Sequence, residues 1–386
     1  MTAAMQSPTE LEAAADRAAG AGRFREALDL LEKAVAGGDA TPDAWKKVSA
    51  MRKASGNLSG ALEAIDLALA FDPTDFTALF SRAIILDQSG SAQAGREFGN
   101  ALAVLPPDQD PPAALAAAIE HARGKWKQHQ EAFERRLNAS VPKGLEPFQR
   151  ERVERFITNR SRRTRPFHQE PTDFAYPGMP EFEFHDRAAF PELDQLEART
   201  DAIRAEFEAL TAAEFAEIVP YTQYPDRVPL RQWQELNNNP KWSAIHLLQN
   251  GRRIDANARH CPVTMEAIAA LGQPDIPGAC PNAMFSLLAP ATRIPAHTGV
   301  ANIRLVCHLP LIVPPDCGFR VGETVRQWVP GEAFVFDDTI EHEAWNDSDR
   351  LRVVLIVDLW PPALGQAERE AVASVIGASG VSFSGA

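Results

Sequence analysis

In the first third of the chain, apolar residues recur with the spacing of amphipathic helices, and this helical pattern is itself repeated. Three glycines stand 34 residues apart: Gly22, Gly56 and Gly90. Five positions after each glycine comes a small residue: Ala27, Ala61 and Gly95. A 34-residue period with glycine at a helix turn and small residues where helices cross is typical of the tetratricopeptide repeat. The pattern predicts about three such repeats between residues 8 and 135.

The regular pattern breaks in residues 136–175, where prolines and charged residues interrupt it. This composition predicts a connector of low hydrophobicity, with one helix around residues 146–158. A second domain is expected over residues 176–365, with a C-terminal tail over residues 366–386. Within that domain, residues 192–217 have the amphipathic spacing of a helix.

After about residue 283, short runs of Val, Ile, Leu and Phe alternate with turn residues. These runs predict six or more short strands, joined by tight turns such as Val329-Pro330-Gly331-Glu332. Many short strands joined in this way favour an antiparallel barrel or sandwich. The whole chain is therefore predicted to be an α+β multidomain protein, in which all-α helical repeats precede a β domain.

Composition narrows the class of protein without changing this division. The 386 residues are 45% hydrophobic and 24% charged, as in globular proteins, and no apolar run approaches the roughly 18 residues of a membrane span. The formal net charge of −13 argues against nucleic-acid binding, and the basic cluster of residues 160–165 is interpreted as a solvated linker. The N-terminus lacks a basic start followed by an apolar core, so we expect a cytoplasmic protein with four free cysteines.

Polar residues occupy unusual positions in two otherwise apolar strands. Because successive side chains of a strand point to opposite faces, Arg304, Val306 and His308 should share one face, while Leu305 and Cys307 point to the core. The last strand repeats the arrangement on one face, with Arg352, Val354, Ile356 and Asp358. A buried arginine requires an anionic partner, so these faces are predicted to line a pocket.

Two histidines stand at expected strand edges, His297 in PAHTG and His342 in DDTIEHEAW. Two imidazoles that converge from two strands suit Fe(II), which a His-x-Asp/Glu pair and a distant histidine normally hold with open positions. Here Gly299 occupies the carboxylate position and cannot act as a ligand. Asp337 and Asp338 are nearby carboxylates, but the sequence FDD is as easily a turn that caps strand ends.

Several segments together resemble the aspartyl/asparaginyl β-hydroxylase family of 2-oxoglutarate-dependent oxygenases. They are KWSAIHLLQNGRR, FSLLAPATRIPAHTG, HTGVANIRLVCHLPL, WVPGEAFVFDDTIEHEAW and RVVLIVDLWPP. The resemblance covers roughly residues 176–365 and implies a double-stranded β-helix, a cupin-like jelly roll, that binds Fe(II) and 2-oxoglutarate. In that family glycine at the carboxylate position is the norm, and a tetratricopeptide array before the catalytic domain is a known arrangement.

The resemblance also implies a role for each matching residue. His297 and His342 would be the two iron ligands. Four residues would bind or enclose 2-oxoglutarate, with Arg352 and Ser286 at its distal carboxylate, His308 near its metal-bound end, and Trp242 lining the pocket. Arg304 would face the carboxylate or amide of the substrate. Considered without the resemblance, His308 could simply form a hydrogen bond inside the barrel, and Trp242 could be an ordinary core residue.

The sequence departs from the family pattern at Val306, because the family strand reads Arg-x-Arg-x-His and the second arginine is absent here. The implied reaction is hydroxylation of the β-carbon of an Asp or Asn residue in a peptide or protein, which the helical repeats could present. The same chemistry on a free or carrier-bound amino acid or on a lipid acyl chain remains open. An alternative of another class is a non-catalytic tetratricopeptide interaction protein whose barrel binds a small anion.

Overall fold

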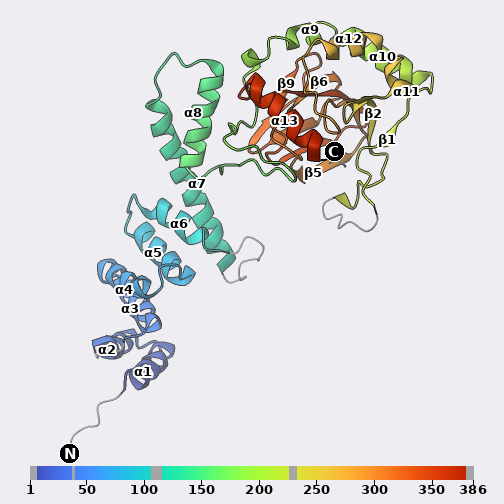
Figure 1. Ribbon diagram of the computed structural model, residues 1–386. Coiled ribbons are helices and arrows are strands. Elements are labelled where there is room, and N and C mark those ends of the chain that lie inside the picture. Colours follow the sequence, from blue (N-terminus) through green and yellow to red (C-terminus); the bar gives the residue numbers. More distant parts are fainter. Residues whose placement is uncertain (1–6, 37–39, 106–114, 226–232, 380–386) are drawn as a thin grey trace, which may run out of the picture. The chain divides into compact units, whose positions relative to one another are not determined.

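The structure, a computed structural model, describes residues 7–36, 40–105, 115–225 and 233–379. The chain divides into two compact units, Met1–Arg163 and Thr164–Ala386 (Figure 1). This division falls inside the segment predicted as a connector. Among the described residues, no helix is both long enough and apolar enough to cross a membrane.

Unit 1 consists of helices that pack as antiparallel neighbours along the chain (Figure 1). They are α1 (Pro8–Gly20), α2 (Phe24–Ala36), α3 (Pro42–Ala54), α4 (Leu58–Phe71), α5 (Phe76–Gln88), α6 (Ala94–Leu102), α7 (Ala116–Ala139) and α8 (Pro147–Arg160). The three glycines of the 34-residue period follow α1, α3 and α5, with positive φ angles of 74°, 83° and 71°. Glycine adopts this left-handed conformation without a steric penalty, so each glycine ends the first helix of a pair.

Small residues allow the second helix of each pair to approach its neighbours. Ala27 and Ala61 are fully buried, as the sequence pattern predicts. Gly95 and Gly99 in α6 contact α7, where a Cβ atom at either position would collide with His129 or Trp126. The two glycines therefore lower the helix propensity of α6 but permit its close contact with α7.

All four arginines of the basic cluster at residues 160–165 are exposed, as expected of a solvated segment, but three of them also contact α7. Arg163 forms an ion pair with Glu134 at 2.7 Å. Arg160 lies over the ring of Phe133, and Arg162 lies over the ring of Trp126. Cation–π contacts and an ion pair thus hold the guanidinium groups on α7.

Unit 2 is built on two antiparallel sheets. The larger has the order β1-β2-β4-β11-β6-β9, with β3 beside β2, and the smaller has the order β5-β10-β7-β8. The strands are β1 (Val219–Pro220), β2 (Trp242–Gln249), β3 (Arg252–Arg253), β4 (Ala283–Leu288), β5 (Thr292–His297), β6 (Leu305–Ile312), β7 (Cys317–Val321), β8 (Thr324–Arg326), β9 (Phe334–Phe336), β10 (His342–Asn346) and β11 (Arg352–Leu359). The expected antiparallel arrangement of short strands is present. The turn at Val329 also forms, with a hydrogen bond from Glu332 N to Val329 O.

The two faces of the larger sheet have different partners. One face, with Leu305 and Cys307, packs in a cluster with residues of α9 (Leu193–Glu197), α10 (Thr200–Ala212) and α12 (Pro262–Ala269) (Figure 1). The opposite face, with Val306 and Val354, packs against Phe319 of the smaller sheet. The predicted alternation in β6 is therefore correct, and the polar face lies between the two sheets.

The end of the chain is more ordered than a tail. Helix α13 (Gln366–Ser379) buries Val372 and Ile376 in a cluster with Ile276 and Ile303. Residues 380–386 of the predicted tail lie outside the described residues. A short helix, α11 (Asp255–Ala258), contacts β2.

The positive φ of Gly56 leads to a testable prediction. The substitution Gly56→Ala should lower the free energy of unfolding of the repeats by about 1 kcal/mol, because an L residue is strained at φ 83° although nothing lies within 4 Å of the new Cβ. The matched control is Gly124→Ala, since Gly124 is an exposed residue inside α7 with equally open surroundings. Helix propensity should make that variant about 0.5–1 kcal/mol more stable. Urea unfolding followed by helical circular dichroism measures both, and equal effects would contradict the assignment.

Candidate active site

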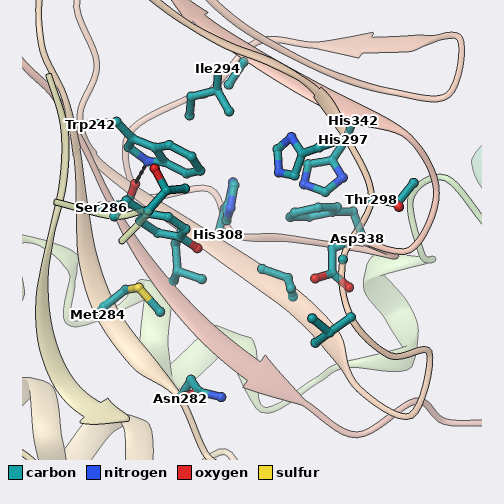
Figure 2. A pocket seen from close by; sticks show the side chains of 18 of the residues that line it. Trp242, Asn282, Met284, Ser286, Ile294, His297, Thr298, His308, Asp338 and His342 are labelled. Atoms are coloured by element: carbon teal, nitrogen blue, oxygen red, sulfur yellow. Dashed lines mark hydrogen bonds between the residues drawn. The ribbon is translucent and has the colours of Figure 1, made fainter. Parts of the chain in front are cut away.

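A cavity of about 200 Å³ lies between the two sheets of unit 2. Inward-facing side chains of β4, β5, β6, β10 and β11 line it, and Figure 2 shows them converging on a common space. All seven site residues predicted from the sequence are among the lining residues: Trp242, Ser286, His297, Arg304, His308, His342 and Arg352. They come from segments separated by up to 110 positions, which the antiparallel pairing brings together.

His297 and His342 are directly opposite each other at the ends of β5 and β10. Their ring centroids are 4.0 Å apart, and both rings point into the cavity (Figure 2). Nδ1 of His297 lies 2.8 Å from Pro295 O, and Nδ1 of His342 lies 3.1 Å from Ile340 O. A backbone carbonyl only accepts, so each Nδ1 carries the proton and each Nε2 is left with a lone pair.

Both imidazoles are held neutral. Burial lowers the pKa of His297 to about 3, with His342 adding to the effect, and burial lowers the pKa of His342 to about 4. Neutral imidazole is the form that binds a metal ion. Among the described residues, no His, Cys, Asp or Glu completes a three-residue cluster with them. A Cβ at Gly299 would meet the carboxylate of Asp338, so a larger residue at this position would require Asp338 to shift.

One end of the cavity holds a buried cation. Arg352 is 2% exposed and donates through Nη1 to the backbone oxygen and the hydroxyl of Ser286, at 3.2 and 3.3 Å. Its guanidinium carbon lies 4.8 Å from the ring centroid of Trp328. In the part of the chain that the structure describes, no carboxylate lies within ion-pair distance of Arg352, and its Nε has no hydrogen-bond partner. Burial therefore lowers its pKa to about 10.

Aromatic side chains enclose this cationic end. Trp242 stacks on Tyr221 with ring centroids 3.9 Å apart, and its Nε1 donates to the hydroxyl of Ser286 at 3.4 Å (Figure 2). Trp328 donates from Nε1 to Nδ1 of His308 at 3.3 Å. Burial and the charge of Arg352 lower the pKa of His308 well below its ordinary value, so this imidazole is neutral.

At the other end of the cavity lies Arg304, a cation that is paired with carboxylates of the protein itself. Nη2 of Arg304 lies 2.9 Å from Asp338 Oδ2, and its Nε lies 3.6 Å from Asp358 Oδ1. Burial alone would lower the pKa of Arg304, but the charges of Asp338 and Asp358 outweigh it and raise that pKa. Burial raises the pKa of Asp358, against the opposing effects of Arg304 and Asn282. Arg304 therefore has its counter-charge within the protein, whereas Arg352 does not.

Sequence reasoning did not recognise the roles of Asp338, Asp358, Trp328 and Tyr221 in this site. Asp338 was weighed only as a metal ligand or a turn, but it is the ion-pair partner of Arg304. Asp358 was placed on the correct face without a partner. Trp328 gave no signal beyond an aromatic residue near a turn, although it contacts both Arg352 and His308. The interpretation of Asp337 as a turn residue is correct, because its carboxylate accepts from the backbone and the hydroxyl of Thr339.

Comparison with known proteins finds relatives of unit 2. Residues 197–362 match the family model described as aspartyl/asparaginyl beta-hydroxylase. The chain is 36% identical over 181 residues to an ornithine lipid ester-linked acyl 2-hydroxylase of Rhizobium tropici, covering 46% of this chain and 60% of that protein. It is 33% identical over 215 residues to human aspartate beta-hydroxylase domain-containing protein 2, covering 54% and 55%. The chain thus spans little more than half the length of these curated relatives.

Solved structures similar to this chain are helical repeat proteins. The TPR domain of Sgt2 from Aspergillus fumigatus is 18% identical, with a TM-score of 0.28 over 36% of this chain and 89% of that one. The first TPR of Spaghetti bound to an HSP90 peptide is 14% identical, with a TM-score of 0.28 over 32% and 94%.

The buried charges around Arg304 lead to a prediction of stability. The substitution Arg304→Met should lower the free energy of unfolding by about 3–5 kcal/mol at neutral pH, because it leaves the carboxylates of Asp338 and Asp358 without their cation. The pKa of Asp358 is already raised in the folded protein, and loss of Arg304 raises it further. Protonation therefore favours the folded variant, so the deficit should shrink as the pH falls toward about 4.

The control for this measurement is Arg350→Met, whose side chain is 68% exposed and lies 4.0 Å from Asp349. Its free energy of unfolding should stay within about 0.5 kcal/mol of the wild-type value. Denaturant titrations of both variants across pH 4–8 provide the comparison. A deficit in Arg304→Met that does not change with pH would show that the lost charge is not its cause.

Proposed function

Since this chain belongs through residues 197–362 to the aspartyl/asparaginyl β-hydroxylase family, we propose that its cavity is the active site of an Fe(II)- and 2-oxoglutarate-dependent hydroxylase. The proposal rests mainly on one observation. Arg352 is buried and has no carboxylate partner among the described residues, and it lines the same cavity as two neutral histidines. A dicarboxylate that carries a metal-chelating group at one end matches both features.

The residues present fit a ferrous ion. His297 and His342 would hold it through Nε2, because both Nδ1 atoms are engaged by backbone carbonyls and both rings are neutral. No third His, Cys, Asp or Glu of the described residues forms a cluster with these histidines, so the remaining positions would be left to the co-substrate and to small molecules. When bound, the iron supplies the redox chemistry that couples decarboxylation of 2-oxoglutarate to hydroxylation of the substrate.

The cationic end would hold the distal carboxylate of 2-oxoglutarate. The planar guanidinium of Arg352 donates two parallel hydrogen bonds to such a group, and the hydroxyl of Ser286 can donate a third. Trp328 supports the guanidinium from its face. Trp242 and Tyr221 exclude water from this end, and His308 would contact the co-substrate nearer the iron. The protein thus positions both reactants without requiring a side chain to act as an acid or a base.

We also propose that unit 2 has the fold that the family resemblance implies. From β4 onward, consecutive strands alternate between the two sheets, except that β7 and β8 both lie in the smaller one, which gives β4-β11-β6-β9 in one sheet and β5-β10-β7-β8 in the other. This order supports the proposal of a double-stranded β-helix, in which facing sheets would enclose a site at one end. The cytoplasm remains the proposed compartment, because all four cysteines are free and buried.

The substrates considered from the sequence share this chemistry. They are the β-carbon of an Asp or Asn residue in a peptide or protein presented by the helical repeats, a free or carrier-bound amino acid, and a lipid acyl chain. The Rhizobium tropici relative, by its name, acts on an acyl chain. The alternative of a non-catalytic interaction protein would explain an anion site at Arg352. It gives no reason for two buried neutral imidazoles whose free nitrogens share the cavity.

The proposal predicts a spectroscopic signal. Anaerobic addition of Fe(II) and 2-oxoglutarate to the metal-free protein should produce the weak charge-transfer absorption of a chelated keto acid. His342→Ala should abolish the band. Arg352→Met should weaken 2-oxoglutarate binding at least about 30-fold, because a buried charge pair contributes roughly 2–5 kcal/mol to binding. Arg352→Lys, which keeps the charge but loses the planar fork, should fall between the two.

The control is His121→Ala, since His121 is an exposed histidine of unit 1 that pairs with Asp87. It should leave the band and the affinity for 2-oxoglutarate at wild-type values. If well-folded wild-type protein gives no band, the iron and 2-oxoglutarate assignment is wrong and the interaction-protein alternative replaces it.

A further inference from the structure

We propose that the substrate end of this cavity selects an uncharged carboxamide, such as the side chain of an asparaginyl residue, and excludes a carboxylate. This inference rests on the proposed function, because it assigns the substrate class of the same site. It concerns the end of the cavity that contains Arg304, Asp338 and Asp358, shown in part beside Asp338 and Asn282 in Figure 2.

The first observation is the charge at this end. Arg304 is 5% exposed and is already paired with Asp338 and approached by Asp358. The net charge of the three groups is negative, or zero if Asp358 is protonated. Asp358 is also held by the backbone N–H and the side-chain amide of Asn282, each at 2.8 Å. An incoming carboxylate would therefore meet no excess positive charge and would lose its hydration without compensation.

The second observation is the hydrogen-bonding capacity that remains. The ion pair between Arg304 and Asp338 uses one atom of each group, Nη2 and Oδ2. Nη1 of Arg304 and Oδ1 of Asp338 are buried and have no hydrogen-bond partner within the described protein. One is a donor and the other an acceptor. A carboxamide offers an oxygen to the first and an N–H to the second, whereas a carboxylate can only accept and would be repelled by Asp338.

The third observation is the surrounding wall. Met284, Ile356 and Val306 face the cavity from the neighbouring strands β4, β11 and β6. Ile356 is paired with Met284, and Val306 is paired with Asp358. None of these positions supplies a second cation. Arg352 is six residues from Asp358 on β11, about 20 Å along a strand, so it cannot serve a carboxylate at this end.

A matched pair of substrates tests the selection. The 386-residue chain with Fe(II) and 2-oxoglutarate is given two short capped peptides that differ only in a central Asn or Asp. Succinate release above the substrate-free rate should be at least about 10-fold faster with the Asn peptide, and only this peptide should perturb the charge-transfer band. Free L-asparagine and an amide-free fatty acyl ester are added as separate arms. Stimulation by free asparagine would support the same carboxamide chemistry from another source.

A variant that adds a positive charge at position 306 tests whether charge is the cause of the selection. Val306→Arg places a second cation opposite Asp358 and should shift the ratio of Asn to Asp turnover toward Asp by at least about 10-fold. Val306→Met adds bulk without charge and should change both rates together, leaving the ratio at its wild-type value. The charge-transfer band serves as the check that each variant has folded and binds both metal and 2-oxoglutarate.

The two proposals fail in different ways. If the band forms but the Asp peptide is turned over as fast as the Asn peptide, or only the acyl ester stimulates turnover, the carboxamide assignment is wrong and the oxygenase assignment stands. If the band does not form in the wild-type protein, both are refuted. An unchanged Asn-to-Asp ratio in Val306→Arg, with the band intact, would also overturn the charge explanation.

Discussion

The main physical constraint on unit 2 is that two buried guanidinium groups, those of Arg304 and Arg352, lie between its facing sheets and need electrostatic compensation. An isolated charge at 2–5% exposure is strongly unfavourable unless neighbouring groups compensate it. Arg304 meets this requirement through Asp338 and Asp358, which are brought to it by the loop before β10 and by β11. Arg352 has only the dipoles of Ser286 and the face of Trp328. The fold thus pairs one cation with carboxylates and leaves the other without a carboxylate partner among the described residues.

The register of the strands determines which side chains face the cavity. Pairing of β11 with both β4 and β6 aligns Ser286, Val354 and Ile356 on the inner face. Pairing of β10 with β5 sets His342 opposite His297. A slip of one residue in either pairing would turn these side chains to the opposite face. The helices on the outer face of the larger sheet therefore contribute to the site indirectly, since burial of Leu305 and Cys307 against them fixes that register.

Sequence patterns predicted those parts of the structure that depend on local contacts. The glycine period located the helix turns, because a left-handed residue after a helix favours glycine regardless of what surrounds it. Alternation identified the inner face of β6, because that strand separates two different environments. The same reasoning missed β2, whose first six residues are all buried. Its sequence, WSAIHLLQ, mixes Ser, Ala and His with apolar residues, so it lacks the run of Val, Ile, Leu and Phe by which the later strands were recognised.

By itself, the sequence determined the helical repeats, the run of short strands and the polar residues that were expected to line a pocket, among them His297, His342, Arg304 and Arg352. Only the tertiary structure decided how the charges are distributed among them. Asp338 looked like a turn residue because its partner, Arg304, is 34 positions away. Trp328 looked incidental because its contacts with Arg352 and His308 are equally non-local. Pairing across sheets depends on three-dimensional proximity, so the sequence does not show which arginine is paired with carboxylates; this is decided only when the strands assemble.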